Sequence, residues 1–248
     1  MAAFSKASTF TREVAMRIFA EELRSSSITF RDSDDQYAPL YLLTPTGARC
    51  NRLFLVATLT EKDQIGEEAE YWRGRVVDPT GSVFVYAGQY QPEAAQILAR
   101  IEPPAFVAVV GKPNLYETED GNIIVSIRAE SIQRVGAATR DRWIIDAARH
   151  TLKRLQRLMD SGSGSETAGK DDDVQKALLH YKTDAGRYRQ MAIAALESLK
   201  AERMGAGPAA FKPADEEEPY PSRVIMDEME DIEDIEEIDF TRRSEKFI

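Results

Sequence analysis

Apolar and polar residues alternate with a two-residue period through the middle of the chain, which is the pattern of half-buried β-strands. The alternating segments are 51–61, 70–78, 82–90, 105–113 and 122–135. The turn Asp78-Pro79-Thr80-Gly81 separates the second segment from the third. Proline presets φ there and glycine can take a positive φ, so we predict a hairpin. The segment PEAAQILARI, which begins at Pro92, predicts a short helix because proline is tolerated in a first helical turn.

A second turn, Glu119 to Asn122, joins the last two strands. Three strands, a helix and two more strands therefore follow one another in fewer than 90 residues. This is the element order of an OB barrel. We predict a mainly β protein built on a five-stranded OB-fold barrel.

Helical patterns flank the predicted barrel. Thr11 is a suitable cap for a helix that runs to about Leu23, with Glu13 in its first turn, where a carboxylate favours the positive helix end. Residues 25–49 mix Ser, Asp, Pro and Thr with short apolar pieces and predict an irregular or short-strand lead-in. After the barrel, 141–159 is predicted to be helical. Its apolar seam, with spacings of three and four, consists of Ile145, Ala148, Leu152, Leu155 and Met159.

A second seam of the same spacing runs from Val174 to Leu199, beyond a linker rich in Ser, Gly and Asp. One seam can pack on the barrel or on the other seam. Two seams also suggest a helical partner, because an exposed apolar stripe is costly. We therefore predict that the seam of 141–159 binds a partner protein.

Charge is segregated along the chain. The net charge is -10, and residues 215–248 alone hold 14 Asp and Glu against 4 Lys and Arg, so the remainder is neutral. An acidic total argues against nucleic acid, but here the acidity belongs to the tail. Met or Ile recurs every third residue from Met226 to Ile238 among carboxylates. Such a segment repels itself as an isolated helix, yet it suits a basic groove.

The predicted organisation follows from these patterns. It comprises an N-terminal helix and lead-in at 1–50, the OB-fold domain at 51–136, a helix after the barrel at 137–160, a flexible linker at 161–173, a heptad-patterned helical segment at 174–204, and a linker with an acidic tail, expected to be disordered, at 205–248.

Composition and motifs argue against catalysis. One cysteine, Cys50, and two histidines, His150 and His180, are too few for a disulfide framework or a zinc site of Cys and His. The chain lacks GxxxxGK(S/T) and GxGxxG phosphate-binding turns, and the aspartates at 171–173 lie in a linker without preorganised oxygens. We expect no enzyme activity, no cofactor and no metal. Without a signal-like start or a membrane-length apolar run, we expect a cytoplasmic protein.

Several runs carry a resemblance to a known family. They are YWRGRVVDPTGSVFVYAGQYQPEA (71–94), EPPAFVAVVGKP (102–113) and YETEDGNIIVSIR (116–128), with REVAMRIFAEEL (12–23) and PTGARCNRLFLVATLTE (45–61) upstream. Through these runs the chain, from about residue 11 to 157, resembles the archaeal replication protein A-associated OB-fold proteins.

The resemblance implies an OB domain that works beside the replication protein A large subunit, on a plan related to the eukaryotic middle subunit. In that plan a helix after the barrel joins a bundle shared between subunits, and 141–159 occupies the matching place. The implied function is that of a single-stranded DNA-binding accessory subunit of a hetero-oligomer in DNA replication, repair and recombination.

The strand pattern indicates which residues would contact DNA. If Val83, Val85 and Ala87 fill the barrel, Phe84 and Tyr86 face outward, because side chains alternate along a strand. OB folds bind nucleic acid on the second and third strands, where rings can stack on bases. Neighbouring basic and aromatic residues extend this surface. The predicted DNA-binding residues are Tyr71, Arg73, Arg75, Phe84, Tyr86, Lys112, Tyr116 and Arg128.

These residues also have structural interpretations. The two rings of the third strand can pack under a loop or against the N-terminal helix, and the arginines can be solvated or pair with Glu68 and Glu70. Trp72 suits the core. An alternative function is a protein-interaction scaffold that binds the replication protein A large subunit without contacting DNA. The acidic tail can then mimic phosphates in a basic groove of that partner or of this barrel, or recruit another repair factor.

Overall fold

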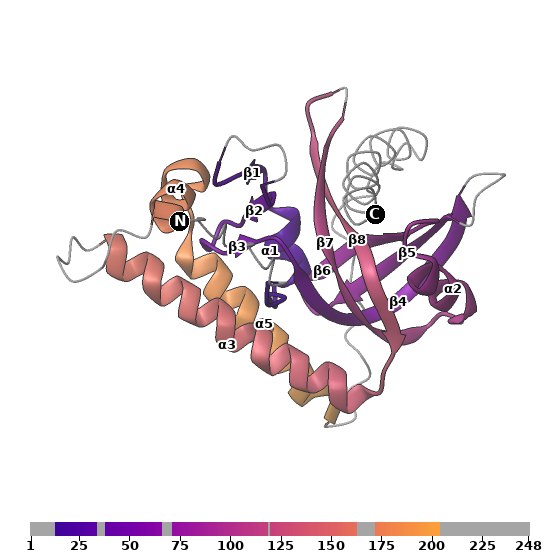
Figure 1. Cartoon of the computed structure of the whole chain (residues 1–248). Helices are drawn as coiled ribbons and strands as arrows, with labels where there is room; N and C mark the ends of the chain where they lie inside the picture. Colours follow the sequence, from indigo (N-terminus) through magenta and orange to yellow (C-terminus); the bar gives the residue numbers. More distant parts are fainter. Residues whose placement is uncertain (1–12, 34–37, 66–70, 119, 163–171, 204–248) are drawn as a thin grey trace, which may run out of the picture.

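The structure is a computed structural model that describes residues 13–33, 38–65, 71–118, 120–162 and 172–203 (Figure 1). The predicted linker at 161–173 lies largely outside these residues, and the acidic tail at 205–248 lies wholly outside them. Within the described ranges, none of the helices is long and apolar enough to cross a membrane.

Five strands close into a barrel in the order β4-β5-β6-β8-β7. They are β4 (Leu53–Ile65), β5 (Tyr71–Asp78), β6 (Gly81–Ala87), β7 (Ala105–Glu117) and β8 (Ile123–Arg134). Neighbouring strands are antiparallel except β6 and β8, which run parallel. The helix α2 (Pro92–Arg100) connects β6 to β7. A closed five-stranded barrel with this order is an OB fold, so the predicted fold is confirmed.

The side chains on one side of each strand form the core of the barrel. On β6, Val83, Val85 and Ala87 all belong to the buried core. Ala87 pairs with Trp72 of β5, which packs partly buried against the same core. The two-residue alternation of β6 therefore divides its side chains between the inside and the outside of the barrel as the sequence predicts.

The hairpin between β5 and β6 forms as predicted, with Asp78 paired to Gly81. However, Gly81 does not take the positive φ that the sequence suggested. The Asp78 carboxylate organises the turn instead, because its Oδ1 accepts hydrogen bonds from the N–H groups of Thr80 (2.7 Å) and Gly81 (3.1 Å). Its Oδ2 accepts a third from the N–H of Ala20 (2.8 Å), at the start of the first helix. In the β7–β8 hairpin, Gly121 does take a positive φ of 78°.

The N-terminal helix is shorter than predicted. The helix α1 spans Ala20–Arg24, so the predicted helix from Thr11 to Leu23 is wrong for residues 13–19. Met16 forms a parallel bridge to Leu53, in which its N–H donates to the Arg52 carbonyl at 2.8 Å. The pairing of β4 with β5 begins only at Thr58, so β5 does not supply hydrogen-bond partners for the backbone groups on that edge of β4 before Thr58. Backbone pairing at that edge outweighs the weak tendency of a short helix to form.

The lead-in folds as short strands. It contains β1 (Ile28–Phe30), β2 (Tyr41–Leu43) and β3 (Arg49–Cys50), which form a small sheet in the order β1-β2-β3. This is the short-strand alternative of the sequence interpretation. In Figure 1 the sheet lies between the barrel and the C-terminal helices.

The C-terminal helices pack on one another. α3 (Ala137–Gly162) follows β8 closely in the chain, and α5 (Ala185–Arg203) runs along it (Figure 1). The second predicted seam is divided, because α4 (Asp172–Tyr181) ends before α5 begins. Lys182 has a positive φ of 48°, and Asp184 accepts a hydrogen bond from the N–H of Gly186 (2.8 Å) as α5 starts. The seams therefore contact each other within one chain.

Candidate nucleic-acid interface

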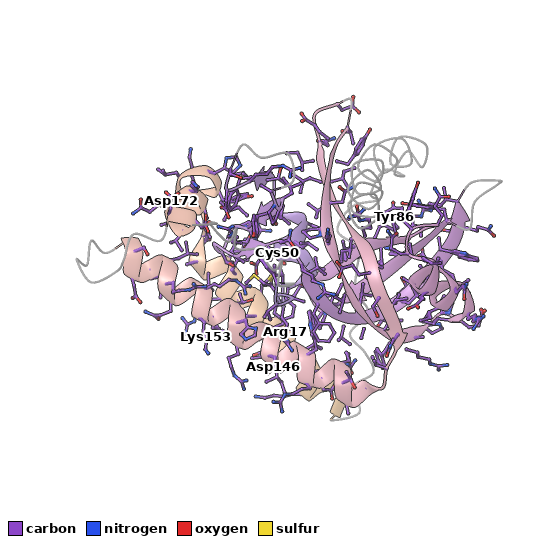
Figure 2. The ribbon with its side chains drawn as sticks, viewed as in Figure 1. Arg17, Cys50, Tyr86, Asp146, Lys153 and Asp172 are labelled. Atoms are coloured by element: carbon purple, nitrogen blue, oxygen red, sulfur yellow. The ribbon has the colours of Figure 1, made fainter. Side chains whose placement is uncertain are left out.

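Strand register sets one row of predicted DNA-binding residues across the barrel wall. Arg73 on β5 pairs with Tyr86 on β6, Tyr86 pairs with Arg128 on β8, and Arg128 pairs with Lys112 on β7. Residues directly opposite one another on neighbouring strands project from the same side of a sheet. Figure 2 shows Tyr86 on the barrel, well away from α3. The row therefore crosses four strands on the outer side of the barrel.

The remaining predicted residues lie beside this row. Arg75 pairs with Phe84, and each lies two residues from a member of the first row along its strand. Tyr71 precedes Arg73 by two residues, and Tyr116 pairs with Ile124, four residues from Arg128. All eight thus share one side of the wall. We call Tyr71, Arg73, Arg75, Phe84, Tyr86, Lys112, Tyr116 and Arg128 the basic-aromatic face.

The rings of this face form a small apolar cluster outside the barrel core. Tyr86 is only 1% exposed and packs against Tyr71, whose ring centroid lies 6.1 Å away. Phe84 is half-buried against the same pair. Burial raises the pKa of Tyr86 to about 12, against the opposing effect of the Arg73 guanidinium. Packing, the structural alternative, thus applies to Tyr86, while Phe84 keeps part of its ring accessible.

The ring of Tyr71 occupies space that a side chain at Gly88 would fill. A Cβ on Gly88 would lie 2.3 Å from Cδ2 of Tyr71, which is closer than any side chain allows. Gly88 follows β6 directly, so the ring of Tyr71 lies across the end of that strand. The aromatic cluster therefore depends on the missing side chain at residue 88.

The two arginines of β5 pair with carboxylates of β4. Nη2 of Arg73 lies 2.9 Å from Oδ2 of Asp63, and Nη1 of Arg75 lies 3.6 Å from Oε1 of Glu61. The sequence interpretation paired them with Glu68 and Glu70, which lie outside the described residues. The Nε atoms of both arginines are buried and have no hydrogen-bond partner among the residues that the structure describes. The Nη atoms of both side chains, which make the ion pairs, are therefore the groups through which these arginines can bind an anion.

Lys112, Tyr116 and Arg128 come from the β7–β8 hairpin, which projects beyond the barrel (Figure 1). A register shift between Val110 and Gly111 precedes Lys112. A Cβ on Gly111 would lie 2.3 Å from the Arg128 carbonyl oxygen, so the two strands approach this closely only because residue 111 is glycine. The bulge brings Lys112 opposite Arg128 on the same side of the hairpin.

The predicted partner-binding residues of α3 divide into two groups. Ala148 and Leu155 are buried within this chain's own core. Ile145, Leu152 and Met159 are 37%, 39% and 54% exposed and recur every seven residues. The buried side of α3 is centred about one residue away from the predicted seam, because α5 and the barrel approach the helix from the side of Ile144 and Ala147.

Two charged features escaped the sequence interpretation. The first is a buried ion pair, in which Nη2 of Arg154 lies 2.7 Å from Oε2 of Glu22. The second is a groove of about 620 Å³ between residues 14–17 and α3, whose lining includes Arg17, His150 and Lys153. Figure 2 places Arg17 and Lys153 far from Tyr86. Neither feature has a sequence signal, because each joins segments more than 100 residues apart.

The known proteins that this chain resembles are only distantly similar to it. No family model matches the chain, and no curated protein matches it. Among solved structures, the second single-stranded DNA binding protein of Mycobacterium smegmatis is 19% identical, with 34% of this chain and 86% of that one covered and a TM-score of 0.30. The mitochondrial single-stranded DNA binding protein Rim1 of S. cerevisiae is 15% identical, with 34% and 92% covered and a TM-score of 0.28. The OB assignment rests on the strand order and register described above.

Proposed function

We propose that this chain binds single-stranded DNA on its basic-aromatic face and is a binding protein rather than an enzyme. The observation that carries the proposal is the row of Arg73, Tyr86, Arg128 and Lys112 across four neighbouring strands. This row includes β5 and β6, the second and third strands of the barrel, whose surface OB folds use for oligonucleotides.

The chemistry of the face suits a single strand. Cationic side chains attract phosphates without reading sequence, and aromatic rings offer surfaces on which any base can stack. The guanidinium groups of Arg73 and Arg75 belong to partly exposed side chains and can donate to phosphate oxygens. Asp63 and Glu61 offset part of the positive charge, so we expect moderate, salt-sensitive affinity.

The cellular role that we propose next rests on the resemblance of the sequence to the archaeal replication protein A-associated OB-fold proteins. We propose that the chain acts with the replication protein A large subunit, as a cytoplasmic accessory subunit in DNA replication, repair and recombination. The exposed residues Ile145, Leu152 and Met159 on α3 are the surface that we assign to this partner. Three apolar side chains with a seven-residue spacing suit a further helix.

A titration of fluorescent oligo-dT with the full chain, followed by anisotropy at about 50 and 200 mM salt, tests DNA binding. Phe84→Ala should weaken binding about fivefold or more, because it removes a stacking surface. Arg73→Ala should weaken binding and lower the salt slope by about one. Arg142→Ala, on α3 with a side chain 76% exposed, is the matched control and should change neither. Equal affinities for Phe84→Ala and Arg142→Ala would contradict the proposal.

A scaffold that contacts no DNA is the second candidate. It is favoured by the burial of Tyr86 and by the ion pairs of Arg73 and Arg75, which are also what a purely structural surface would show. The same titration with the replication protein A large subunit separates the two. A scaffold predicts no binding by the chain alone and an unchanged DNA affinity when the chain joins its partner.

A further inference from the structure

The acidic tail and the basic-aromatic face are complementary in charge. The segment from Met226 to Asp239 carries nine carboxylates and no Lys or Arg. The face carries four cations, and two carboxylates of β4, Asp63 and Glu61, lie near its arginines Arg73 and Arg75. Opposite charges at this density attract strongly at low ionic strength.

The acidic tail and the basic-aromatic face also carry complementary apolar groups. The tail segment repeats Met or Ile every third residue, at Met226, Met229, Ile232, Ile235 and Ile238. The rings of Tyr71, Tyr86 and Phe84 on this face form an apolar cluster with Ile65 and Ile124. A segment with carboxylates and regularly spaced apolar side chains can pair with the cations of the face and also pack on its apolar cluster. The phosphates and bases of DNA would make the same two kinds of contact. The groove near Lys153 is basic too, but no such aromatic cluster lies among its lining residues.

The tail starts near enough to reach the face. Arg140 at the start of α3 forms an ion pair of 2.6 Å with Glu202 near the end of α5, and its guanidinium lies over the ring of Phe106 on β7. The described chain therefore ends beside the barrel. The 22 residues 204–225 can span on the order of 70 Å when extended, which is more than the roughly 45 Å length of a 13-residue strand such as β7. Tethering raises the effective concentration of the segment to about the millimolar range.

We propose that the segment 226–239 docks on the basic-aromatic face of its own chain and competes there with single-stranded DNA. Docking supplies carboxylate acceptors to the partly exposed Arg73 and Arg75 side chains and covers the partly buried members of the cluster, Phe84, Ile65 and Ile124. DNA must displace the segment before it binds. The competition with DNA rests on the proposed function, whereas the docking itself does not.

Docking can be observed directly with a spin label on the full chain. Cys50 is buried, and burial raises its pKa to about 12, so a thiol-reactive nitroxide will attach to an introduced Ser222→Cys. The label should broaden the backbone amide NMR signals of Arg73, Phe84 and Arg128. Broadening confined to His150 and Lys153 would place the segment in the other groove and overturn the proposal, as would broadening nowhere.

Two sets of four neutralising substitutions serve as a matched pair. The docking set is Glu230→Gln, Asp231→Asn, Glu233→Gln and Asp234→Asn; the control set is Asp215→Asn, Glu216→Gln, Glu217→Gln and Glu218→Gln. The docking set should abolish the broadening and raise the affinity for oligo-dT about tenfold at low salt, because it removes an intramolecular competitor. The control set should leave the broadening in place and change the affinity less than about twofold.

The two readouts separate the two proposals. If broadening occurs as expected but no variant binds oligo-dT, docking stands and the DNA-binding proposal fails. If oligo-dT binds and the docking and control sets raise its affinity equally, the effect is one of total charge and the docking proposal fails. Broadening that excess oligo-dT reverses supports both.

Discussion

His150 shows how neighbouring cations set the behaviour of a single residue. It lies on α3, partly buried in the groove that residues 14–17 form with that helix. Burial lowers the pKa of His150, and the nearby guanidinium groups of Arg17 and Arg154 and the ammonium group of Lys153 lower it further, while Asp146 acts the other way. The folded protein therefore favours the neutral imidazole.

This environment predicts a pH dependence of stability. Because the pKa of His150 is lower in the folded state than its ordinary value of 6.5, the unfolded state binds more protons below about pH 6.5. The free energy of unfolding should fall as the pH decreases through that value and on to the folded-state pKa. Urea unfolding between about pH 7.5 and 5 measures it. His150→Gln should flatten the slope.

Elements are joined by polar contacts that their own sequences do not reveal. Glu22 on α1 and Arg154 on α3 are 0% and 3% exposed in their side chains. Nε of Arg154 donates a hydrogen bond to the Thr46 hydroxyl at 2.7 Å, and Nη2 donates another to the Thr151 hydroxyl at 3.0 Å. The network therefore ties two helices to the turn between β2 and β3.

Breaking this pair should be costly. Glu22→Gln leaves the Arg154 charge buried without its counter-ion, so we expect a loss of about 3–5 kcal/mol in the free energy of unfolding. The double variant Glu22→Leu, Arg154→Met removes both charges and should recover much of that loss. Arg149→Ala breaks the exposed pair with Asp146 and should cost less than about 1 kcal/mol. A loss no larger for Glu22→Gln than for Arg149→Ala would refute this account.

On the scale of the whole molecule, the two ends of the described chain are tied together. The hydroxyl of Tyr181 donates to the Leu43 carbonyl at 2.7 Å and accepts from the N–H groups of Ser27 (2.8 Å) and Ile28 (3.1 Å). Thr183 donates to the Pro45 carbonyl at 2.6 Å. These hydrogen bonds thus connect the last helices to the N-terminal segment across 138 to 154 positions of the chain.

Tyr181→Phe tests whether this connection matters for cooperativity. It removes the acceptor of two N–H groups and the donor to one carbonyl, so we expect a loss of about 1–3 kcal/mol. Leu179→Ala, on the same helix with a side chain 81% exposed, should stay within about 0.5 kcal/mol. Tryptophan fluorescence, which reports on Trp72 and Trp143, and far-ultraviolet circular dichroism should give coincident unfolding curves in the wild type. Separate curves would mean that parts of the chain unfold independently.

Local patterns in the sequence predicted much of this architecture. The alternation on β6 predicted that Val85 lies inside the barrel and Phe84 outside it. The turn residues near Asp78 and Gly121 predicted the positions of both hairpins. The seam residues Tyr188 and Ala192 are buried as their spacing indicated. Eight candidate DNA-binding residues share one face for the same reason, because strand period and register place side chains two residues apart on one side. Their contact with DNA remains a prediction.

What the sequence by itself determined is whatever depends on neighbours along the chain: strand and helix periods, turn chemistry and the separation of an acidic tail from a neutral body. Only the tertiary structure decided that residues 13–19 pair with β4, that Arg73 pairs with Asp63, that Tyr86 is covered, and that Glu22 and Arg154 share a buried site. Each of these outcomes is a choice among distant partners. The partner is selected by burial and hydrogen bonding in the folded state, which no local pattern encodes.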